Sequence, residues 1–168
     1  TAFDPADSAA AFRAAMRRVA STVHVVTIRV GDTPMGMTAT AVSSLALTPP
    51  SLLVCVNQSA RMHSPMADVR RFCVNVLGSE QMDVARAFSD SRLRDVRFQT
   101  GDWCVDGEAP PRLADAQASI VCTLKDLHAF GTHSIFVGEV EEVVTRDAVD
   151  PLVYLDGRYL AAGAPLDG

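Results

Sequence analysis

Short apolar runs rich in β-branched residues recur along the chain, and polar segments containing glycine or proline separate them. Runs of this length and composition predict β-strands that end at turns. A strand at 22–30 followed by the turn signal GDTP predicts a hairpin whose returning strand lies in 36–50. Further strands are predicted at 51–57, 72–77, 118–125 and 134–144, and a short strand with an Asp-Gly turn within 151–160.

Apolar residues at helical spacing occur in only a few segments. We expect helices at 7–21, 64–71 and 79–88, and a long polar loop at 89–111. The first helix has an apolar face formed by Phe12, Met16 and Val19.

Six or seven strands joined as hairpins, with few short helices between them, favour an antiparallel barrel over an alternating parallel sheet. The chain lacks the glycine-rich loops of Rossmann and P-loop nucleotide sites. We therefore expect one mainly β domain over residues 1–168, a β-barrel with a few short helices.

The composition of the chain argues against some classes of function, namely binding of nucleic acids and of acidic membranes. The 168 residues are 48% hydrophobic and 21% charged, as in soluble globular proteins, and carry a net charge of -5. Nucleic acids and acidic membranes need a concentrated basic surface, so neither is an expected partner. No apolar run reaches the roughly 18 residues of a transmembrane helix, and the amino-terminal segment is unlike a signal peptide. A cytoplasmic protein is expected.

The four cysteines are widely spaced, with no CxxC motif and no cysteine–histidine pair at metal-ligand spacing. We expect no metal site, and we expect cysteines in apolar runs to act as small core residues.

The stretch GMTATAVSSLALTPP, residues 36–50, has no charge and many hydroxyl side chains. Small residues let a planar ligand approach the backbone, and backbone N–H and hydroxyl groups can bond its polar atoms. A sheet edge packed against a second subunit explains the same composition. The pattern leaves both interpretations open.

Two further segments contain residues suited to ligand chemistry. NQSARMHS, residues 57–64, joins a strand to a helix, and its hydroxyls, backbone donors and Arg61 suit a phosphate, although most such loops bind nothing. His133 lies between a glycine turn and a strand, where a histidine can orient or protonate a substrate or serve the structure alone. The other histidines form no recognisable triad with serine and aspartate.

Taken in order, these segments resemble a known family. GMTATAVSSLALTPPSLLVCVN, then FCVNVL with a following helix that ends in AF, then GTHSIFVGEV, are similar to the short-chain flavin reductases. These are the reductase components of two-component flavin-dependent monooxygenases. The resemblance runs from FRAAMRRVAS to GRYL, nearly the whole chain, and it implies the antiparallel Greek-key fold called the FMN-binding split barrel.

The resemblance also implies a site. His133 would act at the nicotinamide side as the catalytic residue, with Tyr159 near the same pocket. Members commonly read GDH where this chain reads GTH, and the Thr132 form also occurs in the family. The implied flavin contacts are Met37, Thr38, Thr40, Ala41, Asn57, Ser59, Arg61 and Phe88.

The implied activity is that of an NAD(P)H:flavin oxidoreductase. It would transfer a hydride from NADH or NADPH to FMN or FAD and supply reduced flavin to a partner monooxygenase. The resemblance further implies a homodimer. Two alternatives stay open: a flavoprotein whose tightly held flavin reduces a corrinoid or metal chelate, and a non-enzymatic flavin-binding protein. The sequence does not choose between the two flavins or the two nicotinamides.

Overall fold

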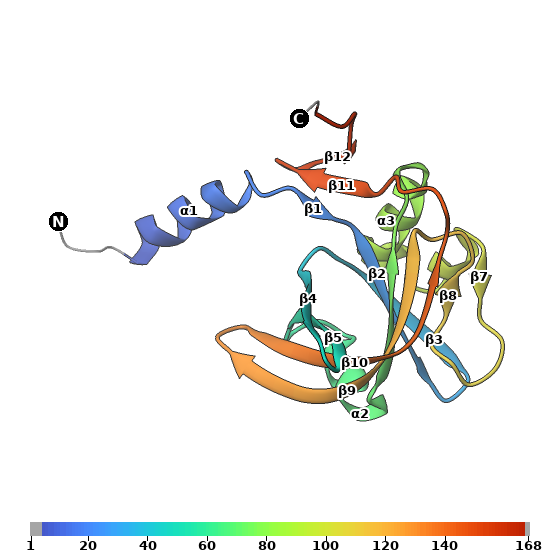
Figure 1. Ribbon diagram of the computed structural model, residues 1–168. Coiled ribbons are helices and arrows are strands. Elements are labelled where there is room, and N and C mark those ends of the chain that lie inside the picture. The colour runs from blue at the N-terminus through green and yellow to red at the C-terminus, as the bar shows by residue number, and fades with distance from the viewer. Residues whose placement is uncertain (1–4, 167–168) are drawn as a thin grey trace.

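A curved antiparallel sheet forms the body of the protein. The computed structural model describes residues 5–166, and neighbouring strands of its seven-stranded sheet are all antiparallel. The sheet curls, and the strands at its two edges run in different directions (Figure 1). From edge to edge the strands are β3 (Thr33–Ala39), β2 (His24–Val30), β6 (Arg71–Val76), β9 (Ala118–Phe130), β10 (His133–Thr145), β5 (Pro50–Asn57) and β4 (Val42–Leu47). The predicted mainly β fold with few short helices is confirmed.

Much of the curvature of the sheet lies in the long strands β9 and β10. β9 pairs with β6 on one side, while the first half of β10 pairs with β5. Their mutual register shifts between Val137 and Gly138 and again between Val140 and Glu142, as at bulges that bend strands. A Cβ at Gly138 would lie 2.5 Å from the Phe72 ring. The glycine therefore lets Phe72 fill the barrel interior.

The prediction of one strand at 36–50 is wrong. The stretch divides into β3 and β4, which lie at opposite edges of the sheet. Thr40 and Ala41 cross between these edges, and the Ala41 carbonyl accepts a hydrogen bond from the Cys55 N–H at 2.9 Å. The physical reason is the curvature of the sheet, which brings its edges near enough for two residues to connect them.

The helices are few and short. α2 (His63–Val69) and α3 (Met82–Ser89) occupy two predicted helical segments, and a 3-10 turn, η1 (Ser79–Gln81), precedes α3. The predicted loop at 89–111 is more ordered than expected. It contains η2 (Ser91–Leu93), η3 (Arg97–Gln99) and β7 (Trp103–Cys104), which pairs with β8 (Arg112–Leu113). No helix within residues 5–166 is long and apolar enough to span a membrane.

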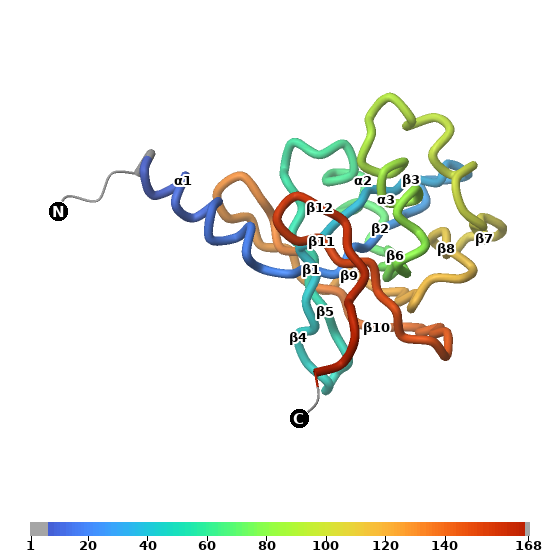
Figure 2. The backbone as a smooth tube through the Cα atoms, turned by 90° about the horizontal axis from the view of Figure 1, so that it is seen from above, coloured from blue at the N-terminus to red at the C-terminus, as the bar shows by residue number. Residues whose placement is uncertain are grey.

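The amino-terminal helix lies apart from this body. α1 (Pro5–Met16) is shorter than predicted and projects away from the sheet (Figures 1 and 2). Its apolar face does not pack on the core of its own chain, since Phe12 is 67% exposed and Met16 is exposed as well; Val19, predicted on the same face, lies beyond the end of the helix and is also exposed. Arg17, just beyond the helix, donates a hydrogen bond to the Asp156 carboxylate at 2.8 Å.

A second, three-stranded sheet contains β1 (Ser21–Thr22), β11 (Leu152–Leu155) and β12 (Arg158–Ala161). The predicted Asp-Gly turn joins β11 to β12, so the carboxyl-terminal element is a hairpin rather than one short strand. Asp156 and Gly157 have φ of 49° and 78°, as a tight turn with two left-handed residues requires.

Two clusters of buried apolar side chains hold these elements together. The first fills the curled sheet and includes Phe72 and Phe136. The second packs α3 against β2 and includes Phe88 and Leu113. The candidate site lies next to α3, where β3 passes over Phe88.

Candidate functional site

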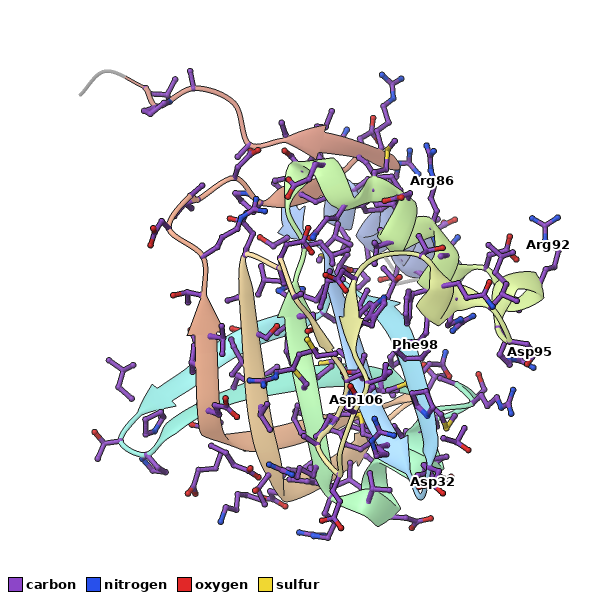
Figure 3. The ribbon with its side chains drawn as sticks, turned by 90° about the vertical axis from the view of Figure 1, so that its right-hand side faces the viewer. Asp32, Arg86, Arg92, Asp95, Phe98 and Asp106 are labelled. Carbon is purple, nitrogen blue, oxygen red and sulfur yellow. The ribbon has the colours of Figure 1, made fainter. Side chains whose placement is uncertain are left out.

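A pocket of about 440 Å³ opens between β3 and the segment that follows α3. Three segments line it: residues 33–37 of β3, residues 60–62 of the loop between β5 and α2, and residues within 94–98. Volumes of about 300 to 1,000 Å³ are usual for small-molecule sites. Figure 3 shows Asp95 and Phe98 on the segment after α3, with Arg92 pointing outward at its outer edge.

Thioether and aromatic side chains give the pocket an apolar surface. The Phe98 ring is held edge-on to Phe88 at 4.9 Å and to Trp103 at 5.2 Å, measured between ring centroids. Methionine side chains are polarizable and adapt to flat aromatic groups, so the surface suits a planar ring. Its apolar residues include Met35, Met37, Met62 and Phe98.

β3 passes directly over the ring of Phe88. A Cβ at Gly36 would lie 2.6 Å from Phe88 Cε1, which leaves no room for a side chain. Phe88 is 2% exposed, and the Arg97 guanidinium lies 5.6 Å from its centroid. Phe88 therefore supports the pocket wall from behind, and a direct contact between its ring and a flavin stays a prediction.

The outer side of β3 offers backbone donors to the pocket. Arg97 Nη1 donates to the Gly36 carbonyl at 2.8 Å, so this carbonyl points away from β2. The N–H and C=O of one strand residue point to the same side, and the pattern repeats every second residue. The N–H groups of Gly36 and Thr38 therefore point outward too, and they are suited to bond the edge of a ring.

The Thr38 side chain has a structural partner. Its hydroxyl donates to the Ala85 carbonyl of α3 at 2.7 Å, which leaves the backbone N–H as the donor that Thr38 can offer to a ring. A contact between Thr38 and a flavin stays a prediction. Met37 lies in the pocket lining. Thr40 and Ala41 are exposed at the crossing from β3 to β4, and their contact with a flavin stays a prediction.

A second group of predicted residues meets where β5 and β10 pair. His133 lies opposite Asn57 in this pair, and the Thr132 hydroxyl is 2.8 Å from His133 Nδ1. Asn57 Oδ1 accepts hydrogen bonds from the Ser59 N–H at 2.9 Å and the Ser59 hydroxyl at 2.8 Å. These bonds shape the loop that leads to Arg61, which lines the pocket. The structure thus brings His133, Asn57 and Ser59 together. None of the three lines the pocket, whereas Arg61, two residues after Ser59, does.

Tyr159 has different neighbours within one chain. Its ring packs against the second cluster, with the Tyr154 centroid at 5.3 Å and the Arg86 guanidinium at 6.0 Å. It is not part of the pocket lining. Its role beside a nicotinamide stays a prediction.

Arginines provide the positive charge in the pocket, and the sequence had indicated only Arg61 among them. Arg94 and Arg97 line the pocket with Arg61. Burial first, and then the neighbouring Arg94 and Arg61 charges, lower the pKa of Arg97. Both missed residues lie in SRLRDVRF, residues 91–98, an arginine-rich string that was treated as loop. The clustered arginines could have indicated an anion-binding segment, but the sequence did not show that this segment faces β3.

Comparison with known proteins identifies the family. The profile of the flavin reductase like domain matches residues 16–163. The FMN reductase (NADH) RutF of Methylorubrum populi is 38% identical over 151 residues, covering 90% of this chain and 75% of the relative. The reductase component of an FADH(2)-dependent resorcinol hydroxylase from a Rhizobium species is 37% identical over 153 residues, covering 90% of this chain and 86% of the relative.

Solved structures have the same fold. The NADH:FAD oxidoreductase of Streptomyces globisporus, solved with NAD and FAD fragments, matches with a TM-score of 0.87 at 32% identity over 99% of both chains. The flavin reductase component of a bacterial two-component tryptophan halogenase matches with a TM-score of 0.83 at 32% identity, covering 94% of this chain and 99% of the other. These matches confirm the predicted split barrel. The chain belongs to the flavin reductase family.

Proposed function

We propose that the chain is an NAD(P)H:flavin oxidoreductase, which transfers a hydride from a nicotinamide to FMN or FAD. The observation that carries this proposal is the pocket beside β3. It combines methionines and a phenylalanine suited to a flat ring, an outward-facing strand edge and arginines suited to a phosphate. Family membership supports the same activity, because relatives are named as NADH-dependent FMN and FAD reductases.

The residues present fit a flavin phosphate ester. Arg97 Nε is buried and has no hydrogen-bond partner within residues 5–166, and Arg61 and Arg94 line the same pocket. A ligand with a planar ring and a phosphate matches both the apolar and the cationic side chains. When bound, the flavin supplies the redox chemistry, because its ring accepts the hydride at N5.

The chain's own residues bind and orient the two reactants. Met37 and the Thr38 backbone hold the ring edge, with Thr40 and Ala41 next to them. Asn57 fixes Ser59, and Ser59 and Arg61 bind the phosphate. His133, held by the Thr132 hydroxyl, orients the nicotinamide. Holding two rings in reactive geometry is the main way in which a protein accelerates such a transfer.

The test is to mix the purified chain with NADH or NADPH and with FMN or FAD, and to follow the nicotinamide absorbance. Flavin-dependent oxidation above the rate without protein is the expected result. No consumption above that background would overturn the proposal. Gel filtration of the flavin-loaded chain then shows whether flavin leaves as a diffusible product or stays bound.

The reduced flavin passes to a separate monooxygenase. Support comes from relatives that are named as reductase components of a hydroxylase and of a halogenase. We place the reaction in the cytoplasm. The cysteines Cys55, Cys73, Cys104 and Cys122 are free thiols, the usual state in a reducing compartment.

The chain acts as a homodimer. One supporting observation is the exposed apolar face of α1, with Phe12 and Met16, together with the exposed Val19 just beyond the helix. Another is an apolar groove of about 350 Å³ lined largely by β4, β5, β9 and β10, with the 88% exposed Leu47 in its lining. Exposed apolar patches of this kind mark contacts between proteins, and a second copy is the commonest partner.

A further inference from the structure

The strand that bears His133 begins at a projecting turn. β10 starts at His133, and the turn that joins it to β9 extends from the body of the protein (Figure 1). Residues 125–133 at this end of the hairpin are all exposed. β5 ends at Asn57, directly opposite His133. His133 therefore lies at the limit of the support that β5 provides, where strand ends fray unless further contacts hold them.

Gln58 continues this support past the end of β5. Its backbone N–H donates to the Thr132 carbonyl at 2.9 Å, and its side-chain Nε2 donates to the His133 carbonyl at 3.0 Å. A carbonyl can only accept, so the side-chain amide must present its NH₂ group to His133. One residue thus bonds two successive residues at the start of β10.

A second side chain of the same loop contacts the next residue of β10. Ser134 is 2% exposed, and its hydroxyl lies 2.8 Å from His63 Nε2. Side chains alternate between the two faces of a strand, so Ser134 faces the interior while His133 faces outward. The loop between β5 and α2 therefore contacts residues 132–134 one after another. This is the same loop that is proposed to bind the flavin phosphate.

The two side chains differ in what else they support. His63 packs edge-on against the buried Phe136 ring, with 5.3 Å between the ring centroids, so a change at His63 disturbs the core. Gln58 is exposed, and its side chain bonds the His133 carbonyl. Removing the Gln58 amide therefore acts on the start of β10 and leaves the core intact.

The placement of His133 has two parts. The Thr132 hydroxyl, 2.8 Å from His133 Nδ1, orients the imidazole ring, and Gln58 holds the backbone from which that ring extends. Hydride transfer needs the reacting atoms about 3–3.5 Å apart, and a displacement of about 1 Å can lower the rate about 100-fold. A residue that orients the nicotinamide must therefore have both its ring and its backbone fixed.

We propose that Gln58 is a positioning residue for the reaction: its side-chain amide holds the backbone of His133 so that the imidazole meets the nicotinamide. The inference rests on the proposed function, in which His133 orients the nicotinamide. Gln58 touches neither reactant in this role and acts only through His133. Its loss should affect the use of NADH and leave flavin affinity unchanged, because Asn57 holds Ser59 by separate bonds.

Gln58→Met is the informative variant, because methionine has a side chain of the same length and no N–H donor. We expect kcat/KM for NADH to fall about 2-fold to 10-fold, the factor that corresponds to one neutral hydrogen bond. Dissociation constants for FMN and FAD, measured by quenching of flavin fluorescence, should stay unchanged. Gln99→Met is the matched control, since Gln99 is exposed and does not line the pocket. A wild-type kcat/KM in Gln58→Met, or an equal loss in Gln99→Met, overturns the proposal.

A double variant shows whether Gln58 acts through His133. In a His133→Ala background, Gln58→Met should have no further effect on kcat/KM for NADH, because no imidazole is left to position. Fully additive losses overturn the positioning role, and so does a His133→Ala variant that behaves like the wild type. Thermal melts show whether each variant is folded, and Gln58→Ala replaces Gln58→Met if that variant is not.

Hydrogen exchange tests the contact without turnover. In the flavin-free chain, the backbone amides of residues 131–134 should exchange about 2-fold to 10-fold faster in Gln58→Met than in the wild type or in Gln99→Met. Unchanged exchange overturns the inference even where the chain reduces flavin normally. Failure of the wild type to oxidise NADH with flavin, by contrast, overturns the proposed function, and the exchange rates still show whether Gln58 holds the start of β10.

Discussion

The backbone of Gly36 and the ring of Phe88 adjoin so closely that no methyl group fits between them. A Cβ at Gly36 would lie 2.6 Å from Phe88 Cε1 and 3.3 Å from Thr27 Cγ2. The Phe88 ring has little room to move aside, since Phe98 and Trp103 pack on it at centroid distances of 4.9 Å and 5.0 Å. The position of the pocket wall therefore depends on a glycine at residue 36.

Gly36→Ala is expected to lower the free energy of unfolding by about 1–3 kcal/mol, the usual cost of overpacking. It should also weaken flavin binding, because β3 must move outward into the pocket. Urea unfolding and flavin titration measure the two effects. Adding Phe88→Leu to Gly36→Ala should recover part of the binding, since a shorter side chain leaves room for the methyl. Strictly additive losses in the double variant would contradict the steric explanation.

Arg61→Ala is expected to weaken FMN and FAD binding alike, by about 10-fold to 100-fold, if Arg61 makes one charge-assisted contact with the phosphate next to the ribityl chain. Arg112→Ala is a suitable control, because Arg112 pairs with Glu142 at 2.6 Å and does not line the pocket. An unchanged flavin affinity in Arg61→Ala would remove Arg61 from the site.

Thr132→Val removes the hydroxyl that lies 2.8 Å from His133 Nδ1 while keeping the size of the side chain. Because the imidazole loses its partner, we expect a higher KM for NADH and a lower kcat, with flavin affinity unchanged. Steady-state kinetics and fluorescence titration provide these values. Thr132→Ser retains the hydroxyl and should behave like the wild type. Equal kinetics for the Val and Ser variants would show that this contact does not orient His133.

Much of the fold was predictable because its signals are local. β-branched runs such as 118–125 and the turn signal after 22–30 lie within a few residues of the strands that they specify. The prediction of one strand at 36–50 was wrong because the feature that divides this stretch is not local. Its division at Thr40 and Ala41 depends on the curvature produced by β9 and β10, which begin 77 and 92 residues after Ala41.

The residues of the candidate site also differ in whether local sequence indicated them. Asn57, Ser59 and Arg61 lie in one loop directly after a strand, and the family resemblance pointed to them and to His133. Arg97 was missed because its place depends on distant contacts. It reaches the Gly36 carbonyl across 61 residues of sequence. A loop without periodicity gives no indication of which side chains turn toward a sheet.

Stability should depend on pH through His24. This residue is buried in β2, and its Nδ1 lies 3.2 Å from the Ala39 carbonyl, which can only accept, so the ring donates from Nδ1. Burial lowers the pKa of His24 from 6.5, and the bond to Ala39 opposes this only in part. The unfolded chain therefore takes up the proton at a higher pH than the folded chain. Stability is retained above the unfolded pKa and falls as the pH decreases below it.

His24→Gln keeps a hydrogen-bond donor but cannot be protonated, so it should remove this part of the pH dependence. The free energy of unfolding in urea is compared at about pH 7.5 and about pH 5.5 for both proteins. The wild type should lose up to about 1.4 kcal/mol more than the variant for each pH unit below the unfolded pKa. Equal losses in the two proteins would contradict a neutral, buried His24.

Phe12→Asp should shift the proposed dimer toward monomer, because it puts a charge in the middle of the exposed apolar face of α1. Light scattering behind gel filtration, run over a range of concentrations, measures the shift. Ala10→Asp is the matched control, since residue 10 lies on the opposite side of the helix from residue 12. Neither change should alter the folded monomer, because α1 projects away from the body (Figure 1). If both variants stay dimeric at the concentrations where the wild type does, α1 is not part of the contact.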